Sequence, residues 1–343
     1  MQGKSLLSDI AIIRPLLILS IILGHAFTVF AGSSSWPLPE GAKQIRVYSY
    51  LNPILISFAL QAFVFVSGYL FAYKNPAKFS SAKYVYLLAK ARRLLLPSVI
   101  FSILYIAVLS PQKFCNISVV YDIINGVGHL WFLPMLFWCY VFGVYTYEYF
   151  LNLSYVKIIL LVIGVMLSHL VASLLGDPFR FFSGVQYFAY FVVGSLVYKY
   201  RSSLLDIIEV RYTVYSWIII AILCIFKVYL QNVAIYNDLI SKILINVFLY
   251  ADRILLGVIG SITLWATINL LIKYLRLNVR GNIWFGLYIY HQIIMMLLYY
   301  HTSLPLMINS VWLPWLVFVI TLSLSYMMVE LTLKTKIGRE LIG

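Results

Sequence analysis

Long apolar runs separated by short polar segments dominate this sequence. Most of the runs approach the roughly 20 residues that a helix needs to cross the hydrocarbon core of a bilayer. Because lipid offers the backbone no hydrogen-bond partners, runs of this length predict helices. The pattern predicts an all-α, polytopic integral membrane protein of about ten transmembrane helices in a single domain over residues 1–343. The runs cover residues 10–31, 51–73, 94–110, 130–150, 156–175, 183–199, 212–231, 243–272, 283–302 and 311–333.

Two of these runs depart from the usual span length. The third run is short, so we expect its helix to begin earlier, near Lys83, which places Arg92 and Arg93 at the membrane interface. The eighth run is long and contains Asp252 and Arg253. Charged groups are costly in lipid, so this helix could be tilted, broken or partly cytoplasmic, and its sequence leaves these alternatives open.

Composition supports lipid as the solvent and excludes a soluble globule. The chain is 63% hydrophobic and 10% charged, whereas soluble domains carry about 25% charged residues. A net charge of +14 could indicate nucleic acid, but the cations lie between the spans, so we expect no nucleic-acid partner. The 3 cysteines form no disulfide or metal-binding pattern, and we expect no metal.

The placement of the cations predicts the orientation of the chain. Cytoplasmic loops of membrane proteins are enriched in Lys and Arg, and here the cations gather in alternate loops. We therefore expect a multi-pass protein of the inner (plasma) membrane with both termini in the cytoplasm. The cations on the expected cytoplasmic side are Lys4, Lys74, Lys78, Lys83, Lys90, Arg92, Arg93, Lys157, Lys199, Arg201, Arg211, Lys273, Arg276, Arg280, Lys334, Lys336 and Arg339. The opposite loops hold Lys43, Arg46, Lys113, Arg180 and Lys242.

The first span carries two ionisable residues, Arg14 and His25. Ionisable groups inside a span are functional candidates because their burial is costly. Eleven residues turn a continuous helix about 20° past three full turns, so both side chains share a face about 16 Å apart along the axis. Pro15 suits the first turn of a helix and so places Arg14 near a cap position. The structural alternative is an Arg that reaches the interface and a His hydrogen-bonded in the core.

Three further segments could carry chemistry, and each has a structural alternative. Lys90, Arg92 and Arg93 form a basic cluster that suits phosphate oxygens, or they form an ordinary cytoplasmic flank. His129 and Trp131 lie in the segment GHLWFLP, which could also be an aromatic anchor at the interface. The segment LYIYHQ, residues 287–292, puts Tyr288, Tyr290 and His291 below the surface, where helix packing could explain them.

The order of these motifs is more informative than any one of them. Ten residues separate Arg14 from His25 in the first span, and FVFVSGYLF begins at Phe63. Lys90 and Arg93 precede LLLP, HLWFL begins at His129, and YIYH ends at His291. In this arrangement the chain resembles the acyltransferase-3 family of membrane-bound acyltransferases, which includes bacterial surface-polysaccharide O-acetyltransferases. SGY, residues 67–69, also offers a small residue for close helix approach.

The resemblance implies transfer of an acyl group, most simply acetyl from cytoplasmic acetyl-CoA, to a hydroxyl of a cell-envelope glycan or lipid-linked sugar. It implies that His25 is either the base for that hydroxyl or a covalent acyl carrier, and that Arg14 binds or orients the donor. Lys90 and Arg93 would hold the phosphates of CoA, although Lys90 stands where the family has Arg. Tyr288 or His291 would complete the site.

Two functions outside acyl transfer also fit a polytopic membrane protein. A transporter or flippase of a lipid-linked glycan would need buried polar residues too. Transporters often contain inverted repeats with paired broken helices, and the sequence shows no such repeat. A structural or sensing role is the third alternative. Consumption of acetyl-CoA by the purified protein would separate the enzyme from the other two.

Overall fold

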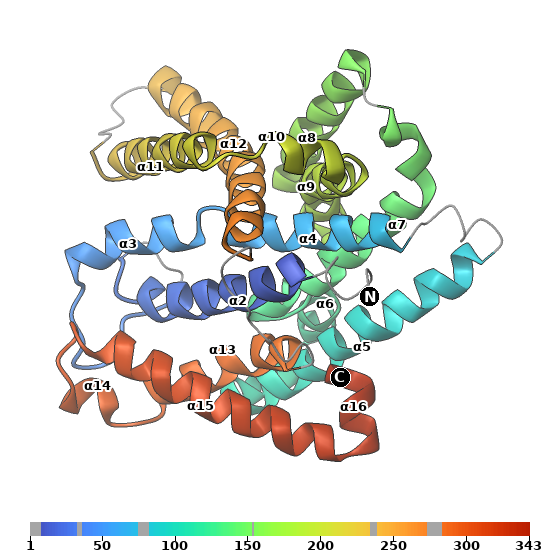
Figure 1. Cartoon of the computed structure of the whole chain (residues 1–343). Coiled ribbons are helices and arrows are strands. Elements are labelled where there is room, and N and C mark those ends of the chain that lie inside the picture. Colours follow the sequence, from blue (N-terminus) through green and yellow to red (C-terminus); the bar gives the residue numbers. More distant parts are fainter. Residues whose placement is uncertain (1–7, 33–35, 75–81, 153, 234–238, 273–282) are drawn as a thin grey trace. The chain divides into compact units, whose positions relative to one another are not determined.

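The computed structural model describes residues 8–32, 36–74, 82–152, 154–233, 239–272 and 283–343. These residues form helices joined by short loops, and they contain no β-strand (Figure 1). Five of the cations used to predict the orientation lie outside the described residues: Lys4, Lys78, Lys273, Arg276 and Arg280.

Nine helical segments of the described chain are long and apolar enough to cross a membrane. A further helix, α13 (Trp284–Tyr300), has 17 residues, which is the lower limit for a span. The predicted fold class, an all-α polytopic membrane protein, is confirmed. The nine segments are Ser8–Thr28, Arg46–Tyr73, Lys83–Leu109, Gly128–Leu151, Tyr155–Leu175, Pro178–Lys199, Val210–Leu230, Ile245–Ile272 and Leu313–Lys334.

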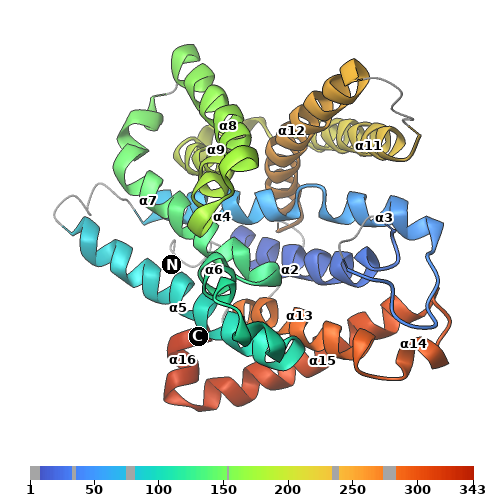
Figure 2. The same cartoon turned by 180° about the vertical axis from the view of Figure 1, so that it is seen from behind.

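The helices pack into two compact units, each assembled from separate stretches of the chain. The first unit comprises Met1–Phe63, Tyr200–Gly281 and Tyr299–Val319. In it, α2 packs against α3 and α12, and α11 lies beside α12 (Figures 1 and 2). Its main helices are α2 (Ser8–Thr28), α3 (Arg46–Ile56), α10 (Arg201–Ile207), α11 (Val210–Val233), α12 (Leu239–Ile272) and α14 (Leu304–Met307).

The second unit comprises Val64–Lys199, Asn282–Leu298 and Ile320–Gly343. In it, α9 packs between α7 and α8, and α5 packs against α6, α7 and α16. Its elements include most of α4 (Ala59–Tyr73), α13 and α15 (Leu313–Lys334), followed by α16 (Lys336–Ile342). The others are α5 (Lys83–Leu109), η2 (Pro111–Cys115), α6 (Ser118–Asn125), η3 (Gly128–Trp131), α7 (Phe132–Leu151), α8 (Tyr155–Leu175), η4 (Pro178–Arg180) and α9 (Phe181–Lys199).

Several expectations about single helices are decided by the structure. Helix α5 begins at Lys83, as expected, and α12 is one continuous helix through Asp252 and Arg253. The second span is divided into α3 and α4 near Ser57. The placement of Arg14 near a helix cap is wrong, because α2 begins at Ser8 and Pro15 lies inside it. Membrane helices tolerate such a proline where neighbouring groups satisfy the backbone carbonyl it leaves free.

The glycine of SGY allows the close helix approach that the sequence predicts. A Cβ atom on Gly68 would lie 1.9 Å from the carbonyl oxygen of Phe191 in α9, and one on Gly194 would lie 1.9 Å from that of Phe65. The two helix backbones therefore touch directly. Ser195 joins them further by donating a hydrogen bond to the Gly68 carbonyl oxygen at 3.0 Å.

We expect Gly68→Ala to destabilise the protein because the new methyl group would force α4 and α9 apart. Overpacking of a tight contact costs about 1–3 kcal/mol. Gly164→Ala is the matched control, since a Cβ atom at Gly164 meets nothing within 4 Å. The change from Gly to Ala raises the helix propensity equally at both positions. Thermal unfolding in lipid nanodiscs should show a lower midpoint for Gly68→Ala alone. Equal midpoints in the two variants would contradict the assigned contact.

Candidate active site

Arg14 and His25 lie on one helix of the first unit, α2. Helix α2 is continuous between them, so the geometry of a regular helix places the two side chains about 16 Å apart along its axis. Both side chains are half-buried. An arginine and a histidine at these two depths of one span are unusual, because each must be kept from lipid by neighbouring groups.

The ring of His25 stacks on Trp36, with 5.9 Å between ring centroids and 16° between planes. The loop that carries Trp36 is held by Tyr300, whose hydroxyl donates to the Pro37 carbonyl oxygen at 2.6 Å. Tyr299 donates to the Ala26 carbonyl oxygen at 2.9 Å. The chain before and after His25 is therefore tied to the end of α13 that belongs to the same unit.

Gly24, directly before His25, lets α3 approach α2. A Cβ atom on Gly24 would lie 2.2 Å from the side chain of Ile56 and 3.3 Å from Oδ1 of Asn52. Asn52 Nδ2 donates to Thr28 Oγ1 at 3.0 Å, and Thr28 donates to the Gly24 carbonyl oxygen at 2.8 Å. This polar chain fixes the helix turn that carries His25. The sequence analysis did not single out Asn52, Thr28 or Trp36.

Asp9 anchors the beginning of α2. Its side chain is completely buried and accepts hydrogen bonds from the Ile10 backbone at 2.8 Å and from Trp265 Nε1 at 2.9 Å. Asn269 Nδ2 lies 3.4 Å from the same carboxylate, and Arg201 forms an ion pair with it at 3.4 Å. Helices α10 and α12 therefore hold the first described turn of α2, which precedes Arg14.

In the second unit, His129 lies in the short helix η3 and contacts α13. Oε1 of Gln292 accepts a hydrogen bond from the His129 backbone N–H at 2.6 Å and lies 2.5 Å from Nδ1 of its ring. Tyr288 donates its hydroxyl hydrogen to the His129 carbonyl oxygen at 2.5 Å. His129 is thus held through its backbone and its ring by two residues of one helix.

His291 completes this group of side chains. Its ring centroid lies 4.6 Å from that of His129, edge to face, and its Nδ1 lies 2.7 Å from the Tyr288 carbonyl oxygen. All four side chains are buried, with relative exposures of 5% for His129, 7% for Tyr288, 0% for His291 and 1% for Gln292. The structure therefore brings together three residues that the sequence analysis proposed separately, and adds Gln292.

Helix α5 connects this buried group with the basic cluster. Ser102 Oγ accepts a hydrogen bond from the Val127 backbone at 3.1 Å, just before η3, and Phe101 packs edge to face against Tyr290 of α13 at 5.2 Å. Arg93 lies nine residues earlier on α5, about 13 Å along the helix axis from Ser102. The basic cluster on α5 therefore lies about 13 Å along the helix axis from the level at which η3 and α13 contact α5.

Lys90 and Arg93 occupy different environments on α5. The Lys90 ammonium lies 3.9 Å from the ring centroid of Tyr140 and 5.5 Å from that of Tyr86, a cation–π arrangement. Arg93 is exposed. An exposed guanidinium can present its planar set of donors to a phosphate group, whereas Lys90 offers an ammonium that two aromatic rings already orient.

Trp131 lies at the end of η3, away from the His129 contacts. Its ring packs against Tyr187 at 5.9 Å, and the Arg180 guanidinium lies 5.8 Å from its centroid. Arg180 also donates from Nε to the Asn125 carbonyl oxygen at 3.1 Å. These contacts hold the Trp131 ring against α9 and η4.

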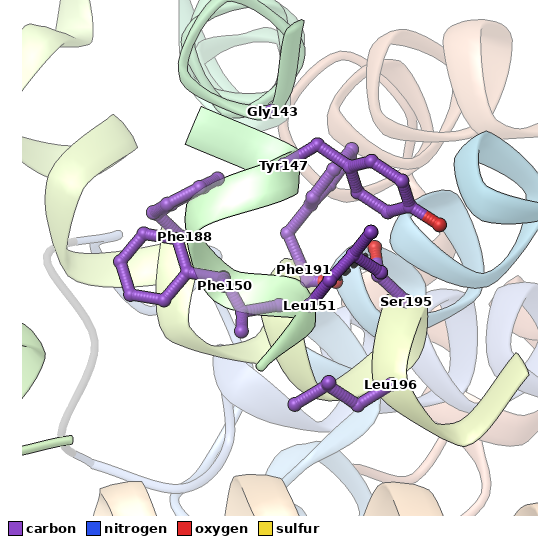
Figure 3. A pocket seen from close by; sticks show the side chains of 9 residues that line it. Gly143, Tyr147, Phe150, Leu151, Phe188, Phe191, Ser195 and Leu196 are labelled. Atoms are coloured by element: carbon purple, nitrogen blue, oxygen red, sulfur yellow. Dashed lines mark hydrogen bonds between the residues drawn. The ribbon is translucent and has the colours of Figure 1, made fainter. Parts of the chain in front are cut away.

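A small pocket opens between α7 and α9 in the second unit (Figure 3). Its lining is apolar, and the hydroxyl groups of Tyr147 and Ser195 are the side-chain oxygen atoms among its lining residues. None of the residues proposed for catalysis or donor binding lines it. Such a surface lacks the cationic groups that a phosphate-bearing donor requires.

The motifs occur within a sequence that matches the family model described as an acyltransferase domain over residues 7–330. The chain belongs to the acyltransferase-3 family. As a member of the acyltransferase-3 family with many apolar helices, the protein is a multi-pass membrane transferase that moves an acyl group from a donor to an acceptor. The resemblance drawn from the motifs is confirmed. No curated protein and no solved structure matches the chain.

The candidate residues of this acyltransferase-3 protein fall into both units. Arg14 and His25 belong to the first unit, and the other candidates belong to the second. The most informative residue that the sequence analysis missed is Gln292. Its signal was its position directly after His291 in a membrane helix, where an amide side chain is as costly as any other polar group. The candidates of the second unit are Lys90, Arg93, His129, Trp131, Tyr288 and His291.

Proposed function

We propose that this acyltransferase-3 protein moves an acetyl group from cytoplasmic acetyl-CoA to a hydroxyl of a cell-envelope glycan or a lipid-linked sugar. The observation that carries the proposal is the placement of Arg14 and His25 on one continuous membrane helix of a chain that belongs to an acyltransferase family. We further propose that the protein lies in the inner membrane with both termini in the cytoplasm, where acetyl-CoA is available.

The chemistry requires a base, because a sugar hydroxyl is a poor nucleophile at neutral pH. In the proposed reaction the hydroxyl oxygen attacks the thioester carbon while His25 takes the hydroxyl proton. The new C–O bond forms, the C–S bond breaks, and the CoA thiolate leaves and is protonated. Imidazole suits this role because it exchanges protons near neutral pH. The stack on Trp36 supports the proposal because it holds the ring in one orientation.

A covalent route through His25 is the variant of this mechanism that remains open to experiment. An acetyl-imidazole at His25 would carry the acyl group between donor and acceptor. Incubation with acetyl-CoA in the absence of an acceptor, followed by mass spectrometry of the His25 peptide, separates the two routes. A gain of one acetyl group on that peptide supports the carrier route, and an unmodified peptide with normal transfer supports the direct route.

The experiment that tests the function measures both substrates. Purified protein in lipid nanodiscs is incubated with isotope-labelled acetyl-CoA and isolated envelope glycans, and free CoA and labelled glycan are measured by mass spectrometry. We expect CoA release that depends on both the protein and the glycan. Envelope glycans of a deletion strain should lack the acetyl group. Failure of both measurements, together with a glycan found on the wrong side of the membrane in that strain, would instead indicate a transporter.

For donor binding, we predict that Lys90→Ala and Arg93→Ala together raise the dissociation constant of CoA about 100-fold. A lost charge-assisted contact is worth about 1.5–3 kcal/mol, or roughly ten-fold or more for each residue. Lys113→Ala is the control for the loss of a cation outside the cluster, since Lys113 pairs with Asp122 at 3.2 Å on the surface and its removal should leave the constant unchanged. Isothermal titration with CoA measures both. If the double variant binds CoA as the wild type does, the basic cluster only orients the chain in the membrane.

A further inference from the structure

Gln292 makes an unusual double contact with His129. One oxygen atom, Oε1, lies 2.6 Å from the backbone nitrogen of His129 and 2.5 Å from its ring Nδ1. The two residues are 163 positions apart in the sequence, so the contact depends on the packing of η3 against α13. It ties the position of a histidine ring to the same atom that holds its backbone.

The backbone contact decides which end of the Gln292 amide faces His129. A backbone N–H can only donate, so the amide atom opposite it must be the acceptor oxygen and not the NH2 group. The same oxygen faces Nδ1, and an amide oxygen cannot donate. The hydrogen of that contact must therefore come from Nδ1. In the neutral ring this places the lone pair on Nε2.

We infer that Gln292 is a positioning residue that holds His129 in the tautomer with its proton on Nδ1, so that Nε2 is the basic nitrogen of this site. The inference rests on the proposed function for its catalytic meaning, because the acyl acceptor of that reaction carries hydroxyl groups that can donate a hydrogen bond to an unprotonated Nε2. The tautomer itself follows from hydrogen-bond geometry alone. Gln292 acts through His129 and needs no contact with substrate.

The surrounding structure is built to admit this amide. A Cβ atom on Gly128 would lie 2.5 Å from Oε1 of Gln292, so any other residue there would push the amide away. Gly128 also has a φ of +56°, a backbone conformation that L-residues with side chains rarely adopt. Gln292 and His129 are buried, where a reversed amide would set two donors against each other without water to relieve them.

His291 shows the same arrangement with a different partner. Its Nδ1 lies 2.7 Å from the backbone carbonyl oxygen of Tyr288, and a carbonyl can only accept. Neutral His291 therefore also has its proton on Nδ1 and its lone pair on Nε2. The two rings, 4.6 Å apart, share one tautomer. Their Nε2 atoms suit a hydroxyl, which donates a hydrogen bond, and not a phosphate oxygen, which accepts one.

Nuclear magnetic resonance of the ring nitrogens tests the tautomer directly. The protein is labelled with 15N-histidine, placed in lipid bilayers at about pH 8, above the ordinary pKa of imidazole of about 6.5, and the His129 signals are identified by their loss in His129→Phe. We expect a protonated Nδ1 and an unprotonated Nε2 in the wild type. In Gln292→Met, which keeps the length of the side chain and removes the acceptor, we expect that pattern to be lost.

Two further variants make the result specific. Gln292→Glu keeps an acceptor oxygen and should keep the proton on Nδ1. Gln61→Met is the matched control, because Gln61 is another buried glutamine, 4% exposed, on a different helix, and it should leave the His129 signals unchanged. A wild type with its proton on Nε2, or an unchanged His129 pattern in Gln292→Met, would overturn the inference.

Kinetics then link the tautomer to catalysis. We expect kcat of Gln292→Met to fall about ten-fold, as the loss of one hydrogen bond that positions a functional ring would cost, with little change in KM for acetyl-CoA. Gln292→Glu should recover most of the loss. Unchanged kcat in Gln292→Met with an altered tautomer would overturn the positioning role. A wild type that transfers no acetyl group but has its proton on Nδ1 would overturn the proposed function and leave the tautomer assignment standing.

Discussion

His25→Ala should abolish most acyl transfer while the protein still inserts and folds. The variant removes the proposed base or acyl carrier, and general base catalysis commonly contributes about 10²–10⁴-fold in rate. Stability should suffer little, because the His25 side chain is half-buried and its ring stacks on a loop residue, Trp36. The measurement is the rate of acetyl transfer by purified variants that express and elute from size-exclusion chromatography as the wild type does.

His169→Ala provides the matched control for this variant. His169 also lies in a long membrane helix, α8, but it is exposed on that helix. Its removal should leave the rate unchanged. Arg14→Lys keeps the charge of the other α2 candidate and loses the planar guanidinium, so an intermediate loss is expected. If His25→Ala transfers acetyl at a rate within about three-fold of the wild type, the loss of rate is far below the contribution of a general base. That result would remove His25 from the mechanism.

Asp9→Ala should cause the largest loss of stability among the variants considered. Its carboxylate is completely buried and pairs with Arg201 at 3.4 Å while accepting from Trp265 at 2.9 Å. Removing one partner of a buried ion pair costs about 3–5 kcal/mol because the remaining charge stays in a poorly solvated place. Thermal unfolding in nanodiscs should show a strongly lowered midpoint.

Two comparisons distinguish this anchor from a general effect of charge. Asp206→Ala removes an exposed aspartate of α10, the helix that begins at Arg201, and should leave the midpoint unchanged. Asp9→Ala combined with Arg201→Leu should be less destabilised than the sum of the single variants, since neither charge then remains buried without the other. Strict additivity of the two single effects would show that the ion pair contributes nothing.

The span pattern and the fold class could be predicted from the sequence because lipid imposes a local rule. Every apolar run of sufficient length must satisfy its own backbone hydrogen bonds, so hydropathy along the chain suffices. The early start of α5 at Lys83 was predictable for the same reason, since a helix that crosses lipid needs a minimum length. The burial of Asp9 in the first described turn of α2 was not predictable, because its partners Arg201 and Trp265 lie in α10 and α12.

In the candidate site too, the residues could be predicted from the sequence, whereas their contacts could not. Arg14, His25, Lys90, Arg93, His129, Tyr288 and His291 could be named from residue type, depth in a span and the order of the motifs. The role of SGY in close helix approach could be predicted because small residues let the backbones of membrane helices approach closely. Its partner, the Phe191 carbonyl of α9, could not be predicted, because a backbone atom leaves no trace in the sequence.

The sequence by itself determined that this protein is a helical membrane protein of the acyltransferase-3 family, since hydropathy and motif order are properties of the chain alone. Only the tertiary structure decided which polar groups meet. The contact of Gln292 with the backbone nitrogen and the ring Nδ1 of His129 joins residues 163 positions apart. It exists because Gly128 leaves room for the amide oxygen. Hydrogen bonds between side chains act over about 3 Å, so they follow from packing and not from pattern.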